Sequence, residues 1–141
     1  MHTDNFVTLP LTIIKNGKQV VPLKSGLNWG QRIGREQNQA YLSVPIAIRR
    51  LKFFPEIKIP FIIECDDGEQ LKCVIAQADG KAIHTCTNNS AFGKYFRKRL
   101  GIPDGYLVTV QHLYRYGRVS VDIFKKNEYK YYMNFSNEII N

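Results

Sequence analysis

Arginine and amide side chains gather between residues 24 and 41, in a segment that also holds one Trp and three glycines. Side chains of these types form paired hydrogen bonds with the edges of guanine and adenine. The segment has too little apolar periodicity for a core strand or helix, and its glycines permit backbone conformations that other residues avoid. It is therefore predicted to be a shaped loop that reads DNA bases, or else a surface loop that hydrogen-bonds with itself. The donors are Asn28, Gln31, Arg32, Arg35, Gln37 and Asn38.

A second polar segment runs from Lys81 to Arg99. Its first part, as far as Asn89, is dense in hydroxyl and amide side chains, and its end carries a basic run. Hydroxyls and amides ahead of a helix commonly cap it, and a basic run on a helix is commonly a solvated face. Near a polar loop, the same groups could instead contact bases and phosphates. Both interpretations remain open from the residues alone.

No arrangement of residues typical of catalysis is found. The three histidines lack metal-ligand spacing, and no Gly-rich phosphate loop or zinc-protease motif is present. Glu56 and Lys58 match the tail of a nuclease motif only superficially, because they lie between two prolines. The carboxylates near Asp66 sit on an Asp-Gly turn, which geometry explains. The sequence therefore predicts no enzyme activity in this chain, no metal and no cofactor, although a nuclease that uses those carboxylates remains a rival.

The charge distribution favours a polyanionic partner. The 141 residues carry a net charge of +8, and residues 15–52 hold eight basic residues and one acid. A basic face of this kind is typical of nucleic-acid binding, although a basic protein without such a partner remains an alternative. The three cysteines lack CxxC spacing, which fits a reducing cytoplasm. Neither a membrane-spanning run nor a signal peptide is evident.

Short apolar stretches separated by turns predict a mainly β fold in one domain, 1–141. The clearest element is a hairpin over residues 60–76, whose strands flank Asp66-Asp67-Gly68. Two helices are expected, one from Pro45 to Pro55 and one capped by Ser90. Residues 1–7 and 137–141 are expected to be loose ends. The other strands are expected near 9–14, 41–44, 106–110, 119–123 and 129–135, which suggests a small barrel or sandwich.

Several of these stretches resemble the B3-like DNA-recognition domains of restriction endonucleases of the NgoFVII and BfiI type. Ser25-Gly-Leu-Asn-Trp-Gly-Gln-Arg32, followed by Asn38-Gln-Ala-Tyr41, is similar to their N-arm. Residues 45–55 look like their first helix. Ala82-Ile-His-Thr85, the helix that follows and the turn at 103–105 look like their C-arm, second helix and turn. The resemblance covers about residues 8–135.

The resemblance implies a seven-stranded open β-barrel, the B3-like pseudobarrel, with two short α-helices. It also implies two arms, about 24–41 and 81–90, that read a short double-stranded site in the major groove. Trp29, which could also be a packing anchor for its loop, becomes a candidate base reader. The N-arm candidates are Asn28, Trp29, Gln31, Arg32, Arg35 and Asn38. The C-arm candidates are Lys81, His84, Thr85, Thr87, Asn88 and Asn89. The candidate phosphate contacts are Lys24, Ser25, Lys94, Arg97 and Lys98.

The function expected from this resemblance is target recognition for a type II restriction endonuclease of prokaryotic cytoplasm. The expected partners are double-stranded DNA and a nuclease domain that this chain does not contain, with no small-molecule substrate and no membrane. The main alternative is a barrel that binds nucleic acid non-specifically or as a single strand. That alternative needs exposed aromatic platforms, for which Tyr114, Tyr116 and Tyr131 are the candidates. A protein-interaction barrel is a further alternative.

Overall fold

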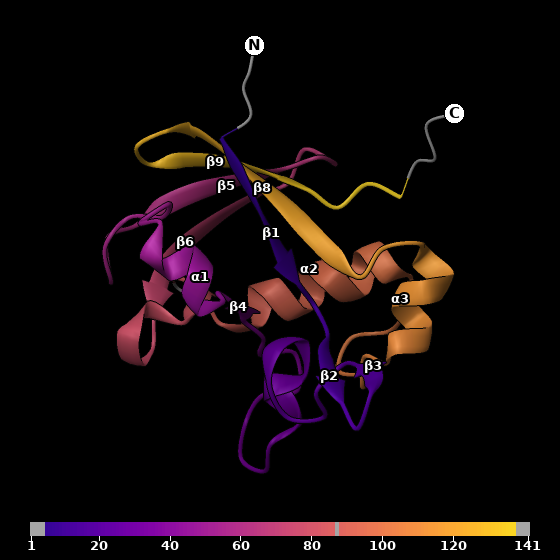
Figure 1. The fold of residues 1–141 in the computed structure, drawn as a ribbon. Coiled ribbons are helices and arrows are strands. Elements are labelled where there is room, and N and C mark those ends of the chain that lie inside the picture. Colours follow the sequence, from indigo (N-terminus) through magenta and orange to yellow (C-terminus); the bar gives the residue numbers. More distant parts are fainter. Residues whose placement is uncertain (1–4, 87, 138–141) are drawn as a thin grey trace.

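The hairpin that the sequence predicts most clearly lies at the centre of a seven-stranded sheet (Figure 1). The computed structural model describes residues 5–86 and 88–137. The strands follow the order β1-β8-β9-β5-β6-β7-β4, and every neighbouring pair is antiparallel except β5 with β9. The sheet curls into a nearly closed, barrel-like shape. Its strands are β1 (Phe6–Pro10), β4 (Leu42–Ser43), β5 (Phe61–Cys65), β6 (Gln70–Ala76), β7 (Ala82–Thr85), β8 (Ser120–Asn127) and β9 (Lys130–Asn134).

The remaining elements lie in the connections between these strands. A separate two-stranded hairpin, β2 with β3, and the 3-10 helix η1 fall between β1 and β4, and a second 3-10 turn, η2, joins β6 to β7. Three α-helices complete the fold. The bounds are β2 (Ile13–Lys15), β3 (Lys18–Val20), η1 (Gly26–Gln31), η2 (Ala78–Gly80), α1 (Ile46–Arg50), α2 (Ser90–Leu100) and α3 (Val110–Tyr116).

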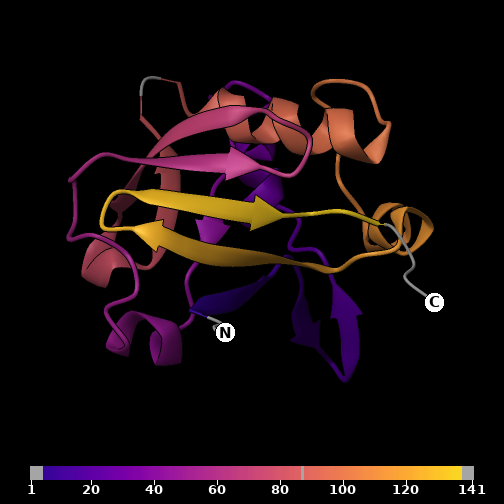
Figure 2. The same cartoon turned by 90° about the horizontal axis from the view of Figure 1, so that it is seen from above.

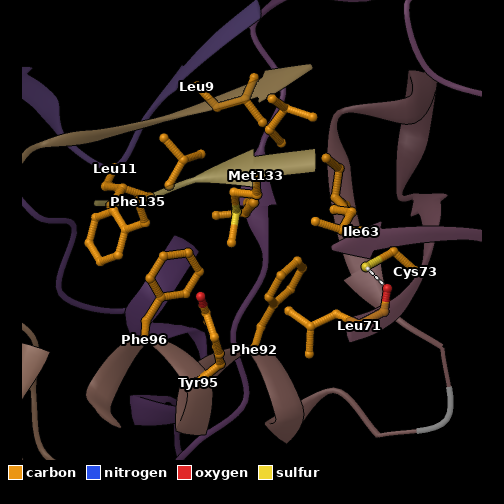
Figure 3. Close-up of a cluster of buried hydrophobic side chains, with 14 of the residues drawn as sticks. Leu9, Leu11, Ile63, Leu71, Cys73, Phe92, Tyr95, Phe96, Met133 and Phe135 are labelled. Atoms are coloured by element: carbon orange, nitrogen blue, oxygen red, sulfur yellow. Dashed lines mark hydrogen bonds between the residues drawn. The ribbon is translucent and has the colours of Figure 1, made fainter. Parts of the chain in front are cut away.

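The core lies between α2 and the concave face of the sheet. Phe92 and Phe96, one helical turn apart, are fully buried and point toward Ile63 and Met133 of the strands (Figure 3). Figure 2 shows the strands that they meet, with β8 and β9 in yellow beside the magenta hairpin of β5 and β6. Alternate residues of these strands are buried, as period-two patterning requires. The helix therefore has one face in the core and another free to support a different part of the chain.

That other face supports the polar segment 24–41. In Figure 1 the sheet lies above α2, while η1 and the loop after it lie below. Close contacts between α2 and η1 confirm this placement. The hairpin β2–β3 lies beside this segment, also below α2 in Figure 1.

Most of the predicted elements are confirmed, including the mainly β class, the hairpin and the helix from Ser90 to Leu100. The strand expected at 106–110 is wrong. Thr109 caps α3 instead: its hydroxyl accepts the amide of His112, and the His112 ring accepts the amide of Thr109. Only Val108 of that stretch is buried, so it lacks the alternating burial of a strand. The third helix, α3, was not expected.

The loose end expected over residues 1–7 also needs correction. Strand β1 begins at Phe6, and its residues Phe6 and Val7 pair with Phe124 and Ile123 of β8. The side chain of Val7 is buried in the core. Residues 1–4 and 138–141 lie outside the described part of the chain. None of the helices in the described ranges is long and apolar enough to cross a membrane.

Candidate nucleic-acid interface

Side chains from both predicted arms meet in one aromatic cluster. The ring of Trp29, from η1, lies 5.0 Å from that of His84 in β7 and 5.3 Å from that of Tyr41. The guanidinium carbon of Arg35 lies 3.8 Å from the centroid of the Trp29 ring. This distance is typical of a cation–π contact, and the planar guanidinium can stack on the indole there. Arg35 Nη1 also donates to Gln39 Oε1 at 2.8 Å, so two contacts hold an exposed cation in place.

The strained turn between β6 and β7 extends this cluster. Gln77 and Asp79 have positive φ of 68° and 59°, a conformation that is uncommon for residues other than glycine and often marks a functional loop. The Gln77 amide nitrogen lies 3.1 Å from Nε2 of His84. The turn between β6 and β7 therefore contacts, through His84, the same ring cluster as the N-arm.

The surroundings of His84 favour the neutral form of its imidazole. Burial lowers its pKa below the ordinary 6.5, and the nearby positive charge of Arg35 lowers the pKa further. A neutral ring can accept as well as donate one hydrogen bond. His84 therefore presents an uncharged hydrogen-bonding group beside the charged Arg35.

We expect an NMR titration of the His84 ring to give a midpoint below pH 6.5. In Arg35→Gln the midpoint should rise, because the repulsive charge is gone, yet stay below 6.5, because burial remains. His112 is the control, since its pKa is lowered by burial and by Arg115 rather than by Arg35. An equal shift of both rings in Arg35→Gln would contradict the assigned cause.

Asn28 is a structural residue rather than an exposed base reader. Its side chain is fully buried. The amide nitrogen donates to the carbonyls of Pro22 and Val108, each at 2.8 Å, and the amide oxygen accepts the Val108 N–H, also at 2.8 Å. Buried polar groups need such partners. Asn28 thus joins η1 to a segment 80 positions away, and we correct the interpretation that it contacts bases.

Asn38 has a similar structural role. It is 5% exposed, and its Oδ1 accepts the Gly105 N–H at 2.6 Å while its Nδ2 donates to Glu36 at 3.0 Å. Glu36 in turn accepts hydrogen bonds from the Ser90 hydroxyl and from the Asn38 backbone N–H. The hydrogen bond from Ser90 is the largest cause that lowers the pKa of Glu36. This network holds the end of the N-arm against the start of α2.

Arg97 was expected to hold a phosphate, and the structure corrects this expectation. Its side chain is fully buried. Nε donates to the carbonyl of Tyr106 at 2.9 Å, Nη1 to that of Gly93 at 3.1 Å and Nη2 to that of Leu27 at 3.3 Å. Burial lowers the pKa of the guanidinium. Arg97 therefore links α2 to both η1 and the 103–108 segment from inside the protein.

Gly93 lets the N-arm approach α2 closely, and Gly30 lets two parts of the N-arm approach each other. A Cβ on Gly93 would lie 1.7 Å from the carbonyl oxygen of Asn38, and a Cβ on Gly30 would lie 2.3 Å from that of Glu36. Real Cβ atoms never come this close to a carbonyl oxygen. The backbone of the N-arm thus rests directly on α2, with no side chain between them.

The remaining N-arm candidates are divided between internal bonds and the surface. Gln31 donates to the carbonyls of Gln37 and Gly105, at 3.2 and 3.1 Å. Arg32 is exposed and donates through Nε to the carbonyl of Lys24 at 2.8 Å. Ser25 is half-buried. Among the candidate residues, the exposed cations are Lys24, Arg32, Arg35, Lys81, Lys94 and Lys98.

The C-arm candidates are also divided. Thr85 is buried, and its hydroxyl donates to the carbonyl of Asn88. Asn88 is exposed and its Oδ1 accepts the Ser90 N–H at 2.8 Å, so it is Asn88, and not Ser90 as predicted, that satisfies the start of α2. Asn89 is half-buried and its carbonyl accepts the Ala40 N–H at 3.2 Å. Thr87 lies outside the described residues.

The basic run at the end of α2 separates into three environments. Arg97 is buried, and Lys98 is exposed. Arg99 forms a two-pronged salt bridge with Asp66, its Nη2 lying 2.8 Å from Oδ2 and its Nη1 3.0 Å from Oδ1. Asp66 also accepts the Phe135 N–H, so the carboxylate at the hairpin turn is used structurally.

Two of the three tyrosines named as stacking platforms for the single-strand alternative are not exposed. Tyr131 is fully buried and donates to the carbonyl of Phe53. Tyr116 is half-buried and stacks on Phe135, at 4.6 Å between ring centroids. Of the three tyrosines that the sequence indicated, Tyr114 is exposed, and it bonds to Gln19.

Three residues of this surface were missed by the sequence interpretation. Tyr41 and Gln77 both contact His84 in the ring cluster. Ile33 is fully exposed between Arg32 and Gly34. A large apolar residue inside a polar, glycine-bounded loop was the available signal for Ile33. No local signal distinguishes Gln77, because its place depends on the pairing of β6 with β7.

Within residues 5–86 and 88–137, no group of three or more His, Cys, Asp or Glu side chains could hold a metal ion. Comparison with known proteins adds a family to this geometry. Residues 2–127 match the NgoFVII C-terminal B3-like DNA-binding domain. No curated protein matches the chain.

Proposed function

Because the chain belongs to the family of NgoFVII C-terminal B3-like DNA-binding domains, it is a DNA-binding domain, and we propose that it reads a short duplex sequence. Two arms, about 24–41 and 81–90 with the adjoining 77–80 turn, would enter the major groove. The domain would serve as the target-recognition part of a restriction endonuclease, while a separate nuclease domain cuts. No small-molecule substrate or cofactor is needed for this role, and the cytoplasm is the expected location.

The observation that carries this proposal is the fixed position of Arg35. Arginine bonded in a paired fashion to guanine is the commonest specific base contact, and it depends on a correctly oriented guanidinium. Stacking on Trp29 and the bond to Gln39 supply that orientation before DNA arrives. Preorganisation of this kind reduces the entropy that is lost on binding.

The base readers that we propose are the accessible side chains of the two arms. Arg35, His84 and the exposed Ile33 are central, since an apolar group can contact the thymine methyl. Phosphates would be held by lysines on the same face. The other proposed base contacts are Trp29, Gln31, Arg32, Lys81, Asn88 and Asn89. The proposed phosphate contacts are Lys24, Ser25, Lys94 and Lys98.

Selection of bound sequences from a random duplex pool tests this function. We expect the unmodified chain to enrich one short motif at near-physiological salt. For Arg35→Gln we expect discrimination at one base pair to fall by about 1–3 kcal/mol, because one guanine contact is lost. Lys98→Gln is the matched control, since loss of a phosphate contact weakens all sequences alike.

Two results would contradict the proposal. Retention of duplex without an enriched motif would mean that the basic surface binds phosphates alone. Stronger competition by single strands than by duplex would favour the single-strand alternative. Incubation of the same chain with plasmid and Mg²⁺ tests the nuclease rival, because nicked plasmid would place cleavage in this domain.

A further inference from the structure

The hairpin β2–β3 projects from the barrel without joining its main sheet. Asn16 and Gly17 both have positive φ, 52° and 75°, which is the geometry of a tight two-residue hairpin turn. Lys15 and Lys18 face each other across this turn, and both are exposed. The hairpin is tied to α3 by the bond from the Tyr114 hydroxyl to Gln19 at 2.7 Å. It is therefore an ordered projection with cations at its tip.

A cleft of about 390 Å³ separates this hairpin from the N-arm. Its lining combines apolar side chains, which include Ile13, Val20 and Pro22, with the cations Lys15, Lys24 and Arg32. No acidic residue occurs between residues 5 and 35. The cleft thus combines an apolar surface with three positive charges and no opposing carboxylate among its lining residues.

A hydrogen bond to the backbone orients the side chain of Arg32. Its Nε donates to the Lys24 carbonyl at 2.8 Å. Within the described part of the chain, its two terminal nitrogens have no hydrogen-bond partner. They remain available for an outside acceptor, which is a base edge in the role proposed above or a phosphate oxygen of the adjoining backbone.

We propose that this cleft holds the sugar–phosphate backbone of the DNA next to the bases read by the N-arm. The inference rests on the proposed function and adds a third contact element, with Lys15 as a phosphate ligand. A nucleic-acid strand alternates charged phosphates with sugars that have apolar faces. This chemistry matches a cleft lined by both cations and apolar side chains. The hairpin also hangs on the side of α2 that carries the N-arm (Figure 1).

The test compares Lys15→Gln with Lys126→Gln in salt titrations of duplex binding. Both lysines lie on strands, and Lys126 is next to the last residue of β8, just before the β8–β9 turn. In Figure 1 that turn lies at the top of the molecule and the β2–β3 hairpin at the bottom. We expect Lys15→Gln to reduce the slope of log K against log salt by about one and to weaken all sequences alike. The enriched motif should not change. Lys126→Gln should keep the original slope.

Equal slopes for Lys15→Gln and Lys126→Gln would overturn the proposal. Circular dichroism of both variants checks the fold, and the exposed position of Lys15 makes misfolding an unsuitable explanation for a changed slope. Failure of the proposed function has a separate signature, since the unmodified chain would then enrich no motif. The slope comparison still decides the role of the cleft in that case.

Discussion

Replacing Arg97 by Met should lower the free energy of unfolding by about 3 kcal/mol. The same replacement of an exposed arginine on a helix would change that free energy very little. Methionine nearly preserves the volume but donates no hydrogen bond. The carbonyls of Leu27 and Tyr106 would each lose the donor that Arg97 supplies from inside the protein, and the bond to Leu27 is buried. Each such group costs about 1–3 kcal/mol. Urea denaturation measures the difference.

Lys98→Met is the matched control, because Lys98 is the exposed neighbour on the same helix. We expect its stability to stay within about 0.5 kcal/mol of the unmodified chain. Suppose instead that the two variants were equally stable and that the only effect of Arg97→Met were weaker DNA binding. Arg97 would then be a phosphate ligand. That result would contradict the buried position described above.

Replacing Gly93 by Ala should also destabilise the fold, by about 1–3 kcal/mol. In an unobstructed helix the same change stabilises by roughly 0.5–1 kcal/mol, because Ala is the better helix former. Here the added Cβ would collide with the Asn38 carbonyl and push the N-arm away from α2. We therefore also expect weaker selection of the target sequence, since base readers must be held within about 0.5 Å.

Lys94→Ala provides the comparison for stability, since Lys94 is the next residue along α2 and is exposed. It should be neutral or slightly stabilising. A stabilised Gly93→Ala with unchanged target selection would show that the arm does not rest on this glycine. Measuring unfolding and sequence selection on the same samples distinguishes a displaced arm from a globally weakened fold.

The mainly β class could be predicted from the sequence because its signals are local, whereas the choice of a barrel over a sandwich came from the family resemblance. Alternating apolar residues and the Asp-Gly turn predicted the central hairpin, and the spacing of Phe92 and Phe96 predicted the helix that fills the core. The stretch 106–110 was misjudged because its β-forming residues outweighed the cap formed by Thr109 and His112. A capping contact depends on two side chains, and the composition of the stretch conceals it.

The place of the candidate site along the chain stays a prediction, and residue type alone could not divide its buried supporting residues from its exposed ones. Asparagine suits base edges and backbone groups equally well, so residue type alone could not separate Asn28 and Asn38 from the exposed Asn88. Burial decided the matter, and it follows from contacts across large sequence separations, such as that between Asn28 and Val108. Arg97 was misassigned for the same reason.

The division between buried supports and exposed tips has a consequence for engineering. Asn28, Asn38 and Arg97 fix the shape of the arm from within, whereas Ile33 and Arg35 lie in solvent. A library that randomises the solvent-facing positions while keeping the supports would vary the chemistry that the proposed base-reading arm presents to DNA on a constant scaffold. Such a domain is a natural starting point for retargeting, because new specificities can be sampled without rebuilding the loop that carries them.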